Sequence, residues 1–262
     1  MGKLLAEMPL FDLQRADRIK PPSPPVSPPR PDCALVELIH RGHDGYVSFH
    51  TKDPARPGDL RNLCSIPARS LPGLFEQLVP DVERDAFFSI NGFWRGARWS
   101  NNYGYLDDDG QLLPSANRTR QTLRWLTACY ADLDCEKIGI SVGQCVGAII
   151  DAQDKKLLPP ASVITRSGHG VWCFWIIDGM DGRGDRRQPS PHVRAWQEHT
   201  EQWSAVQTAI GNRLAQLGSD AASRDVVRIT RIPGSINTKH EAEYRVNYWI
   251  QLASDKTPYR YT

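Results

Sequence analysis

No C-x-x-C pair occurs in the 262-residue sequence, and its six cysteines are scattered through apolar runs. Such spacing predicts reduced, mostly buried thiols in a cytosol-like compartment. Because no tight group of four Cys and His residues is visible, we expect no structural zinc ion. A chain of this length can bury enough apolar surface to fold without a disulfide or a metal cross-link.

Three further features are missing. No apolar run is long enough to cross a bilayer, and no signal-peptide pattern follows Met1, which predicts a cytoplasmic protein without membrane partners. No G-x-x-x-x-G-K-[ST] phosphate loop occurs, so a helicase motor is not expected in this chain. The net charge is only +2, so any phosphate-binding surface must come from local clustering of Arg and Lys.

Proline is concentrated near the start of the chain. Residues Pro21–Asp32 read PPSPPVSPPRPD, which favours extended polyproline geometry and predicts a semi-rigid linker or exposed strap. Before it, Lys3–Ile19 has mixed helical spacing and is either an arm that docks on the body or a poorly ordered terminus. We therefore divide the chain into an arm and linker, residues 1–33, and one globular domain, residues 34–262.

Apolar periodicity predicts strands interleaved with helices in that domain, without strict alternation, and so a mixed α/β (α+β) fold. Ser141 is the expected N-cap of one helix, and Gly218 the expected C-cap of another. Asp107–Gly110 (DDDG) fits a solvated hairpin turn better than a metal site. The predicted strands are Ala34–Ile39, Gly45–His50, Ala86–Asn91, Thr127–Leu133, Ser162–Thr165 and Val171–Ile177, and the predicted helices are Pro67–Gln77, Asn117–Leu126, Ser141–Ala152 and Val193–Leu217.

Two carboxylates follow an apolar segment at Asp132-Leu133-Asp134. On a strand, alternation places Asp132 and Asp134 on one face, with Leu133 buried behind them. Two oxygen ligands spaced this way suit Mg²⁺ or Mn²⁺, and a pair of such ions can activate a 3′-hydroxyl and stabilise a leaving pyrophosphate. A solvated strand end would give the same D-x-D pattern.

A second group, Ser167-Gly168-His169, lies between two predicted strands. The glycines that flank His169 allow close approach of a ligand, and an imidazole or hydroxyl there can hold a triphosphate oxygen. A hairpin turn with an incidental histidine is the alternative.

The third group runs from Ser219 to Lys239. It holds Asp220 and Asp225, then arginines three residues apart, a Pro-Gly turn, an asparagine and a lysine. Arginine forks and a lysine charge are the side chains that a triphosphate requires. The alternative is a surface strand and turn whose charges are merely solvated.

The order of these groups is D-x-D, then S-G-H between strands, then an aspartate followed by R-x-x-R-x-P-G-S-x-N. It resembles the three signature motifs of the archaeo-eukaryotic primase superfamily, in particular its plasmid- and phage-type replication primases and primase-polymerases. The resemblance spans Phe87 to Lys239. It implies a primase-like core whose central sheet, flanked by helices, presents the carboxylates in a cleft.

The resemblance also implies site residues and partners. It implies a nucleotidyltransferase (a DNA primase or DNA-directed polymerase) that uses two Mg²⁺ or Mn²⁺ ions, a single-stranded DNA template and NTPs or dNTPs, with a replicative helicase or other replication protein as a further partner. Asp220 is preferred over Asp225 as the third acid because of its position after the long helix. The implied metal-binding and catalytic residues are Asp132, Asp134 and Asp220, and the implied nucleotide-binding residues are Ser167, His169, Arg228, Arg231, Asn237 and Lys239.

Residues Phe93–Trp99 (FWRGARW) interleave aromatic side chains with arginines, which suits stacking on bases and pairing with phosphates. This pattern indicates a template-binding role for Trp94, Arg95 and Arg98, with core packing of the tryptophans as the alternative.

Two other functions stay open. One is a metal-dependent replication-initiator nuclease, although the sequence lacks the His-x-His pair usual in such enzymes. The other is an inactive primase-like module that binds single-stranded DNA.

Overall fold

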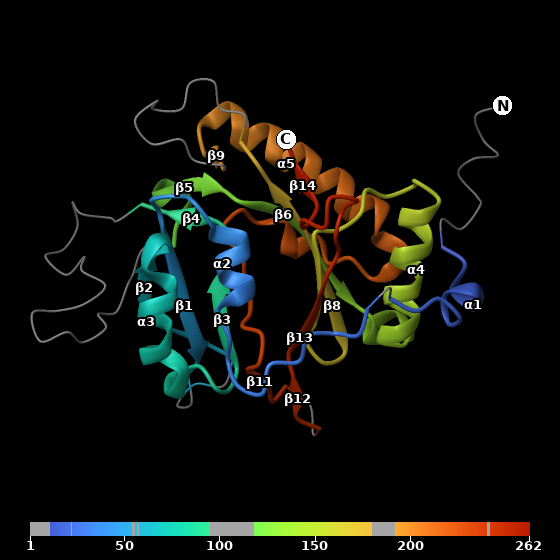
Figure 1. Ribbon diagram of the computed structural model, residues 1–262, viewed down its shortest axis with the longest axis horizontal. Coiled ribbons are helices and arrows are strands. Elements are labelled where there is room, and N and C mark those ends of the chain that lie inside the picture. The colour runs from blue at the N-terminus through green and yellow to red at the C-terminus, as the bar shows by residue number, and fades with distance from the viewer. Residues whose placement is uncertain are drawn as a thin grey trace, which may run out of the picture.

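The computed structural model describes residues 11–21, 23–53, 56, 58–94, 118–179, 192–239 and 242–262 (Figure 1). An antiparallel sheet and a mixed sheet lie side by side, and helices pack on both. The predicted mixed α/β class is therefore confirmed. All six cysteines are free thiols and five of them are buried, as predicted. Across the described residues, no helix is both long and apolar enough to cross a lipid bilayer.

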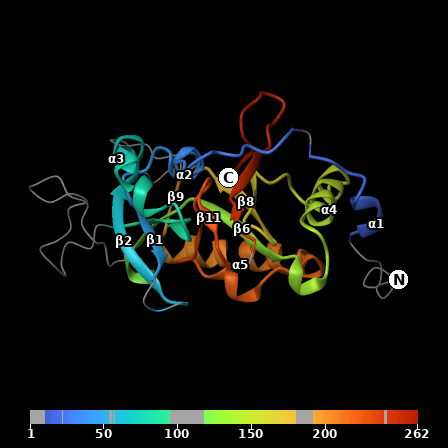
Figure 2. The same cartoon turned by 90° about the horizontal axis from the view of Figure 1, so that it is seen from below.

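The first sheet has the strand order β10-β3-β1-β4-β5-β9, and β2 also pairs with β1. Two helices, α2 (Ala34–His40) and α3 (Leu71–Leu78), lie over the same face of this sheet (Figures 1 and 2). Its strands are β1 (Tyr46–Lys52), β2 (Leu60–Pro67), β3 (Ala86–Ser89), β4 (Gly92–Phe93), β5 (Leu123–Leu126), β9 (Val193–Arg194) and β10 (Ile229–Arg231).

The second sheet has the order β13-β7-β8-β14, and β6 pairs with the other edge of β8. Helix α5 (Gln197–Arg213) packs on β6, and α4 (Val142–Asp154) packs on β8. The strands are β6 (Ala128–Asp134), β7 (Val163–Arg166), β8 (Gly170–Ile177), β13 (Asn247–Ile250) and β14 (Arg260–Tyr261). A separate two-stranded sheet joins β11 (Ile236–Asn237) to β12 (Tyr244–Arg245).

The proline-rich segment lies against both halves of the molecule. Short helix α1 (Leu13–Ala16) packs on α4, and Ala16 is fully buried. The chain then crosses the front of the second sheet, where Val26 forms a bridge with Tyr248 of β13. Just before α2, the Asp32 amide donates a hydrogen bond to the Pro233 carbonyl, 3.0 Å away. We call residues 23–32 the strap.

Two elements differ from prediction. Ala34–Ile39 is not a strand but part of helix α2, because Leu35, Val36 and Ile39 bury one helical face against the core. Asn117–Leu126 is not a helix; Asn117 lies outside the described residues, Arg120–Thr122 form a 3₁₀ turn, and the rest is strand β5. Pairing of β5 with β4 and β9 overrides the local helical pattern.

The other predicted elements are present with shifted ends. The long helix begins at Gln197 rather than Val193, because Val193–Arg194 pair with β5, and its last turn, Ala215–Leu217, is 3₁₀. Within this helix, Trp203 and Ile210 are buried, whereas Val206 is 51% exposed. Ser141 caps α4 by accepting from the Gln144 amide at 3.0 Å, as expected. Asp107–Gly110 lies outside the described residues.

Candidate functional site

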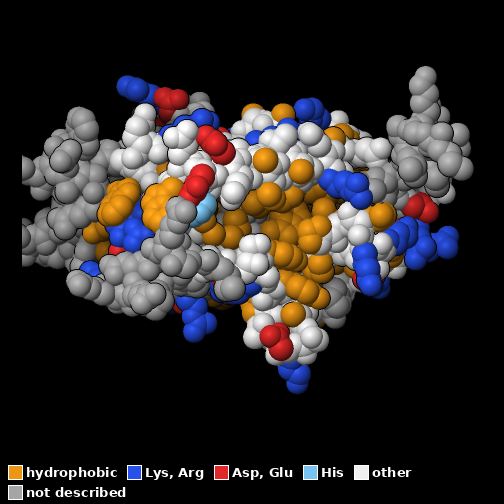
Figure 3. All heavy atoms as spheres, turned by 90° about the horizontal axis from the view of Figure 1, so that it is seen from above, with side chains coloured by type: hydrophobic (Ala, Val, Ile, Leu, Met, Phe, Trp, Pro, Cys, Tyr) orange, Lys and Arg blue, Asp and Glu red, His pale blue; other side chains and the backbone are white. Residues whose placement is uncertain are grey.

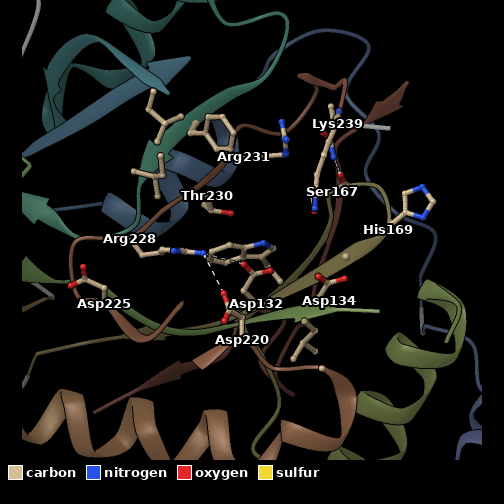
Figure 4. Close-up of a pocket in the computed structure, with 18 of the residues that line it drawn as sticks. Asp132, Asp134, Ser167, His169, Asp220, Asp225, Arg228, Thr230, Arg231 and Lys239 are labelled. Atoms are coloured by element: carbon tan, nitrogen blue, oxygen red, sulfur yellow. Dashed lines mark hydrogen bonds and ion pairs between the residues drawn. The ribbon is translucent and has the colours of Figure 1, made fainter. Parts of the chain in front are cut away.

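A cavity of about 860 Å³ is lined by strands of both sheets (Figure 4). Its floor comes from β6 and β8 of the second sheet, and its opposite wall from β10 and its neighbours in the first sheet. Acidic and basic side chains both line the cavity. The acidic residues are Asp132, Asp134, Glu136, Asp220 and Asp225, and the basic ones are Lys52, Arg118, Lys137, His169, Arg228, Arg231 and Lys239.

The D-x-D pair lies at the end of β6, as the alternation predicts. Asp132 and Asp134 both line the cavity, while Leu133 between them is fully buried. Asp132 is held opposite Trp172 of β8 in the antiparallel register. Burial raises the pKa of the Asp132 carboxyl to about 6, in spite of the nearby Arg228 guanidinium, which acts to lower it.

Asp220 is placed beside Asp132 by the backbone. The segment after α5 forms a short antiparallel bridge with β6 between Ser219 and Leu133. Within it, the Asp220 amide donates to the Asp132 carbonyl at 3.0 Å, and the Asp134 amide donates to the Gly218 carbonyl at 3.1 Å. This bridge brings a carboxylate from the end of a long helix to the strand that carries the other two.

Asp225, the alternative third acid, takes a different position. Its carboxylate accepts from Arg120 at 3.1 Å and from the Val227 amide at 3.4 Å. In Figure 4 it stands at the far side of the cavity from Asp132 and Asp134. Of the two candidates, Asp220 is therefore the one that adjoins the D-x-D pair.

One guanidinium lies between two of the acids. The Arg228 Nη2 atom is 3.5 Å from Asp132 Oδ2 and 3.8 Å from Asp220 Oδ2 (Figure 4, dashed lines). Its Cζ atom lies 6.0 Å from the centre of the Trp172 ring of β8. A cation thus already occupies the space that these two carboxylates share.

Asp134 uses its carboxylate differently, since it accepts from the Lys137 amide at 3.2 Å and so closes the turn after β6. Within the described ranges, no three His, Cys, Asp or Glu side chains are grouped so as to hold a metal ion. The donor set nevertheless fits a hard divalent cation, because it consists of carboxylate oxygens and because the Arg228 charge stands in for such an ion between two of them.

Arg231 forms an ion pair with Asp85, a residue that none of the three sequence motifs contains. Arg231 Nη1 donates to Asp85 Oδ1 at 2.8 Å, and Lys52 Nζ lies 3.3 Å from Asp85 Oδ2. The backbone amide and hydroxyl of Thr238 also donate to this carboxylate. Burial acts to raise the pKa of Asp85, but the hydrogen bonds from Thr238 and Arg231 outweigh it, so the net shift is downward.

Asp85 directly precedes β3 and follows two other acids, Asp81 and Glu83, in a segment without a recognisable motif. Although it is not a glycine, Asp85 has a positive φ of 43°, which no sequence pattern predicts. Arg231 and Thr238, seven residues apart, converge on it from both sides of the Pro-Gly turn. Asp85 therefore fixes the shape of the third motif from outside that motif.

The Ser167-Gly168-His169 turn joins β7 to β8, as predicted. Gly168 has φ of 118°, and a Cβ atom there would lie 3.1 Å from Asn237 Nδ2. That amide donates to the Ser167 carbonyl, while Asn237 Oδ1 accepts from the Lys239 amide at 3.0 Å. Asn237 thus links the second and third motifs, and it brings Ser167 and Lys239 together at the cavity rim (Figure 4).

His169 and the proposed template residues lie further from the acids. The His169 ring points away from the carboxylates and contacts the Tyr244 ring edge-on, with centroids 5.1 Å apart. Trp94 is 47% exposed and stacks on Arg124, whose Cζ lies 3.4 Å from the ring centre, without lining the cavity. Arg95 and Arg98 lie outside the described residues.

Basic side chains of the described residues are dispersed on one face of the molecule. Figure 3 shows the face seen from above, where Lys and Arg side chains are spread around the margin of an apolar area. The grouping of basic residues around carboxylates is a feature of the cavity, which agrees with the small net charge of +2.

Comparison with known proteins gives limited similarity. No family model matches the chain. Over 153 residues the chain is 27% identical to a protein of Clostridium perfringens described as "Replication protein", a match that covers 55% of this chain. The match covers only 34% of that relative, about a third of its length. Among solved structures, the AEP domain of the cyanophage S-2L primase-polymerase aligns over 92% of this chain and 91% of that domain, with a TM-score of 0.49 and 13% identity.

Proposed function

We propose that this chain is the catalytic domain of a replication primase or primase-polymerase of a plasmid, phage or other mobile element. The observation that carries the proposal is the cavity in which Asp132 and Asp220 both contact the Arg228 guanidinium. Further basic side chains line the same cavity. Carboxylates facing a basic wall are what a metal-bound nucleoside triphosphate requires. The similarity to a protein described as a replication protein supports the same proposal.

In this proposal Asp132, Asp134 and Asp220 hold Mg²⁺ or Mn²⁺. Two such ions, when bound, supply activation of a 3′-hydroxyl and charge stabilisation for the leaving pyrophosphate. Asp134 would offer one carboxylate oxygen to the metal, while its Oδ1 accepts from the Lys137 amide. The chain's own task is then to place acids, nucleotide and primer end together.

The basic residues hold the triphosphate. Arg228 and Lys239 reach the cavity from opposite ends of the third motif, and Ser167 offers its hydroxyl beside Lys239. Arg231 is best described as a positioning residue, because its guanidinium is held by Asp85. His169 belongs to the outer end of this site, from which its ring would have to turn to meet a phosphate.

The reaction is nucleotidyl transfer. The 3′-oxygen of one nucleotide forms a bond to the α-phosphorus of the next, and the bond from that phosphorus to the pyrophosphate oxygen breaks. Single-stranded DNA is the proposed template, NTPs or dNTPs the substrates, and a replicative helicase or other replication protein a further partner. Most of the rate gain would come from positioning and from stabilising charge on the phosphates.

The test is primer synthesis on single-stranded DNA with Mg²⁺ or Mn²⁺, comparing NTPs with dNTPs. Wild type is compared with the Asp132→Ala/Asp134→Ala double variant. The control is Asp154→Ala, which removes an exposed carboxylate at the end of α4. We expect short products from wild type and the control but not from the double variant. Template binding without synthesis would instead support an inactive binding module, and strand cleavage a nuclease.

A further inference from the structure

Arg228 has two sets of partners available to it. In this structure its guanidinium contacts the carboxylates of Asp132 and Asp220, at 3.5 and 3.8 Å. The same planar fork suits phosphate oxygens, which it can bind with two parallel hydrogen bonds. A triphosphate bound in this cavity would compete with the two carboxylates, because one guanidinium cannot pair with both at full strength.

The contact with the acids opposes metal binding. A divalent cation that approaches Asp132 and Asp220 meets a positive charge already placed between them. The side chains of these three residues are only 23–40% exposed, so solvent screens this repulsion incompletely. The Trp172 ring, whose centre is 6.0 Å from Arg228 Cζ, gives the guanidinium a further contact on the side of the acids.

A nucleotide changes this balance. Its triphosphate offers the guanidinium a new anionic partner on the basic side of the cavity, where Arg231 is already paired with Asp85. Arg228 can then exchange its two carboxylate partners for phosphate oxygens. The metal ion gains the two carboxylates at the moment when the phosphates it must coordinate are present.

We propose that Arg228 makes divalent-metal binding dependent on nucleotide: it occupies the acid pair in the free protein and moves to the triphosphate when the metal–nucleotide complex binds. This inference rests on the proposed function. It assigns to Arg228 a role in the free enzyme besides phosphate contact. Between two ligands that bind one protein, such coupling acts equally in both directions.

The coupling predicts opposite effects of a single substitution. In Arg228→Gln, Mn²⁺ alone should bind roughly tenfold more tightly than in wild type, because the competing charge is gone. The complex of Mn²⁺ with a non-hydrolysable nucleotide should bind roughly tenfold more weakly, because a phosphate contact is lost. Electron paramagnetic resonance of free Mn²⁺ measures the first affinity, and isothermal titration calorimetry measures the second.

Three further variants separate the explanations. Arg120→Gln removes another arginine–aspartate pair, with Asp225, and should change both affinities less than about twofold. Arg228→Lys keeps the charge and should bind Mn²⁺ alone as weakly as wild type does. Asp132→Asn should weaken Mn²⁺ binding in either state, which identifies the ion's location.

The outcomes distinguish the inference from the function it rests on. If Arg228→Gln binds Mn²⁺ alone no more tightly than wild type, while Asp132→Asn loses it, the coupling is overturned and the proposed metal site stands. If Asp132→Asn binds Mn²⁺ as wild type does, the metal site itself is wrong. Should Arg228→Gln fold poorly, Arg228→Met removes the same charge and takes its place: a larger increase in melting temperature on adding Mn²⁺ than in wild type supports charge competition, and an equal increase overturns it.

Discussion

At the scale of single residues, two aspartates five positions apart have different surroundings. Asp220 adjoins Asp132 and shares Arg228 with it, whereas Asp225 pairs with the exposed Arg120. We predict that Asp220→Asn lowers primer synthesis by about 100-fold or more, the scale of losing one group that stabilises transition-state charge. Asp225→Asn should lower it by less than about threefold, since an exposed ion pair contributes little.

Rates of product formation at saturating nucleotide measure this difference. Both substitutions remove one negative charge and preserve side-chain volume, so each is the control for the other. Equal losses in the two variants would contradict the assignment of Asp220 as the third acid, and a larger loss in Asp225→Asn would reverse it.

A second residue-scale feature is a set of buried histidines where α2 packs on the first sheet. His40 Nδ1 lies 2.9 Å from His43 Nε2, and His40 Nε2 lies 2.8 Å from the Ser89 carbonyl. Because His43 Nδ1 accepts from the Gly45 amide, its proton is on Nε2 and points to His40, which in turn donates to Ser89. The chain of bonds requires that both imidazoles be neutral.

This requirement predicts loss of stability in acid. Burial lowers the pKa of His40 to about 3 and that of His192, whose ring adjoins His43, to about 4. Since both values lie below the unfolded value near 6.5, the unfolded chain binds more protons as the pH falls. Stability should be complete above pH 6.5 and decline between pH 6.5 and 4, by about 2 kcal/mol for each buried histidine at pH 5.

Urea unfolding at pH 7.5 and pH 5 measures that decline. His192→Asn is the informative variant, because it should unfold more easily at pH 7.5 but lose less stability between the two pH values. An identical decline in the variant and wild type would show that acidic unfolding has another cause.

At the scale of elements, the bridge between β6 and the segment after α5 depends on Gly218. Its φ is 80°, and a Cβ atom would lie 2.5 Å from the Asp134 carbonyl oxygen. Gly139 ends a similar 3₁₀ turn with φ of 69°, but a Cβ there would meet nothing within 4 Å. The two glycines share a backbone conformation and differ only in what surrounds them.

We predict that Gly139→Ala costs about 1–2 kcal/mol, the usual penalty for a left-handed non-glycine residue, and leaves primer synthesis intact. Gly218→Ala should cost more and also reduce synthesis, because separating this segment from β6 moves Asp220 away from Asp132. Urea unfolding and primer assays on both variants are the measurements. A Gly218→Ala protein with normal synthesis would show that the bridge does not position Asp220.

The same elements show what the sequence could predict. Strand β6 and helix α4 follow from apolar spacing and a cap, since their buried faces are set by local pattern. Helix α2 and strand β5 do not, because α2 is a short run rich in Leu, Val and Ile, and β5 is defined by pairing with strands far away in sequence.

The candidate site divides in the same way. Asp132, Asp134 and Asp220 were identifiable because they lie in motifs on recognisable elements, and the structure brings them to one cavity. Asp85 and the bridging position of Arg228 were not, because both depend on contacts between segments more than ninety residues apart. No spacing within a motif encodes such contacts.

At the scale of the whole molecule, the strap connects the two sheets along the front of the cavity-bearing body (Figure 2). It follows α1, which packs on α4 beside the second sheet, and it ends where the Asp32 amide donates to the Pro233 carbonyl. Pro233 lies in the turn between β10 and β11, which carry Arg231 and Asn237. Anchoring of α1 therefore bears on the geometry of the third motif.

A pair of glycines in α4 tests this connection. A Cβ atom at Gly147 would lie well inside contact distance of the Ala16 carbonyl oxygen, whereas at Gly143 the nearest atom would be Ser141 Oγ, 3.7 Å away. Gly147→Ala should release α1 and cost about 1–3 kcal/mol by overpacking, while Gly143→Ala should be neutral or stabilise the helix by up to about 1 kcal/mol.

Trypsin cleavage after Arg15 and Arg18 reports release of α1, and it should accelerate in Gly147→Ala alone. If the strap transmits this release to the Pro-Gly turn, the KM for nucleotide should increase in Gly147→Ala with little change in kcat, because the acids on β6 stay in place. Faster cleavage without a change in KM would mean that the strap holds the two sheets together but leaves the nucleotide site unaffected. No change in either would mean that α1 accommodates the added methyl group by shifting along α4.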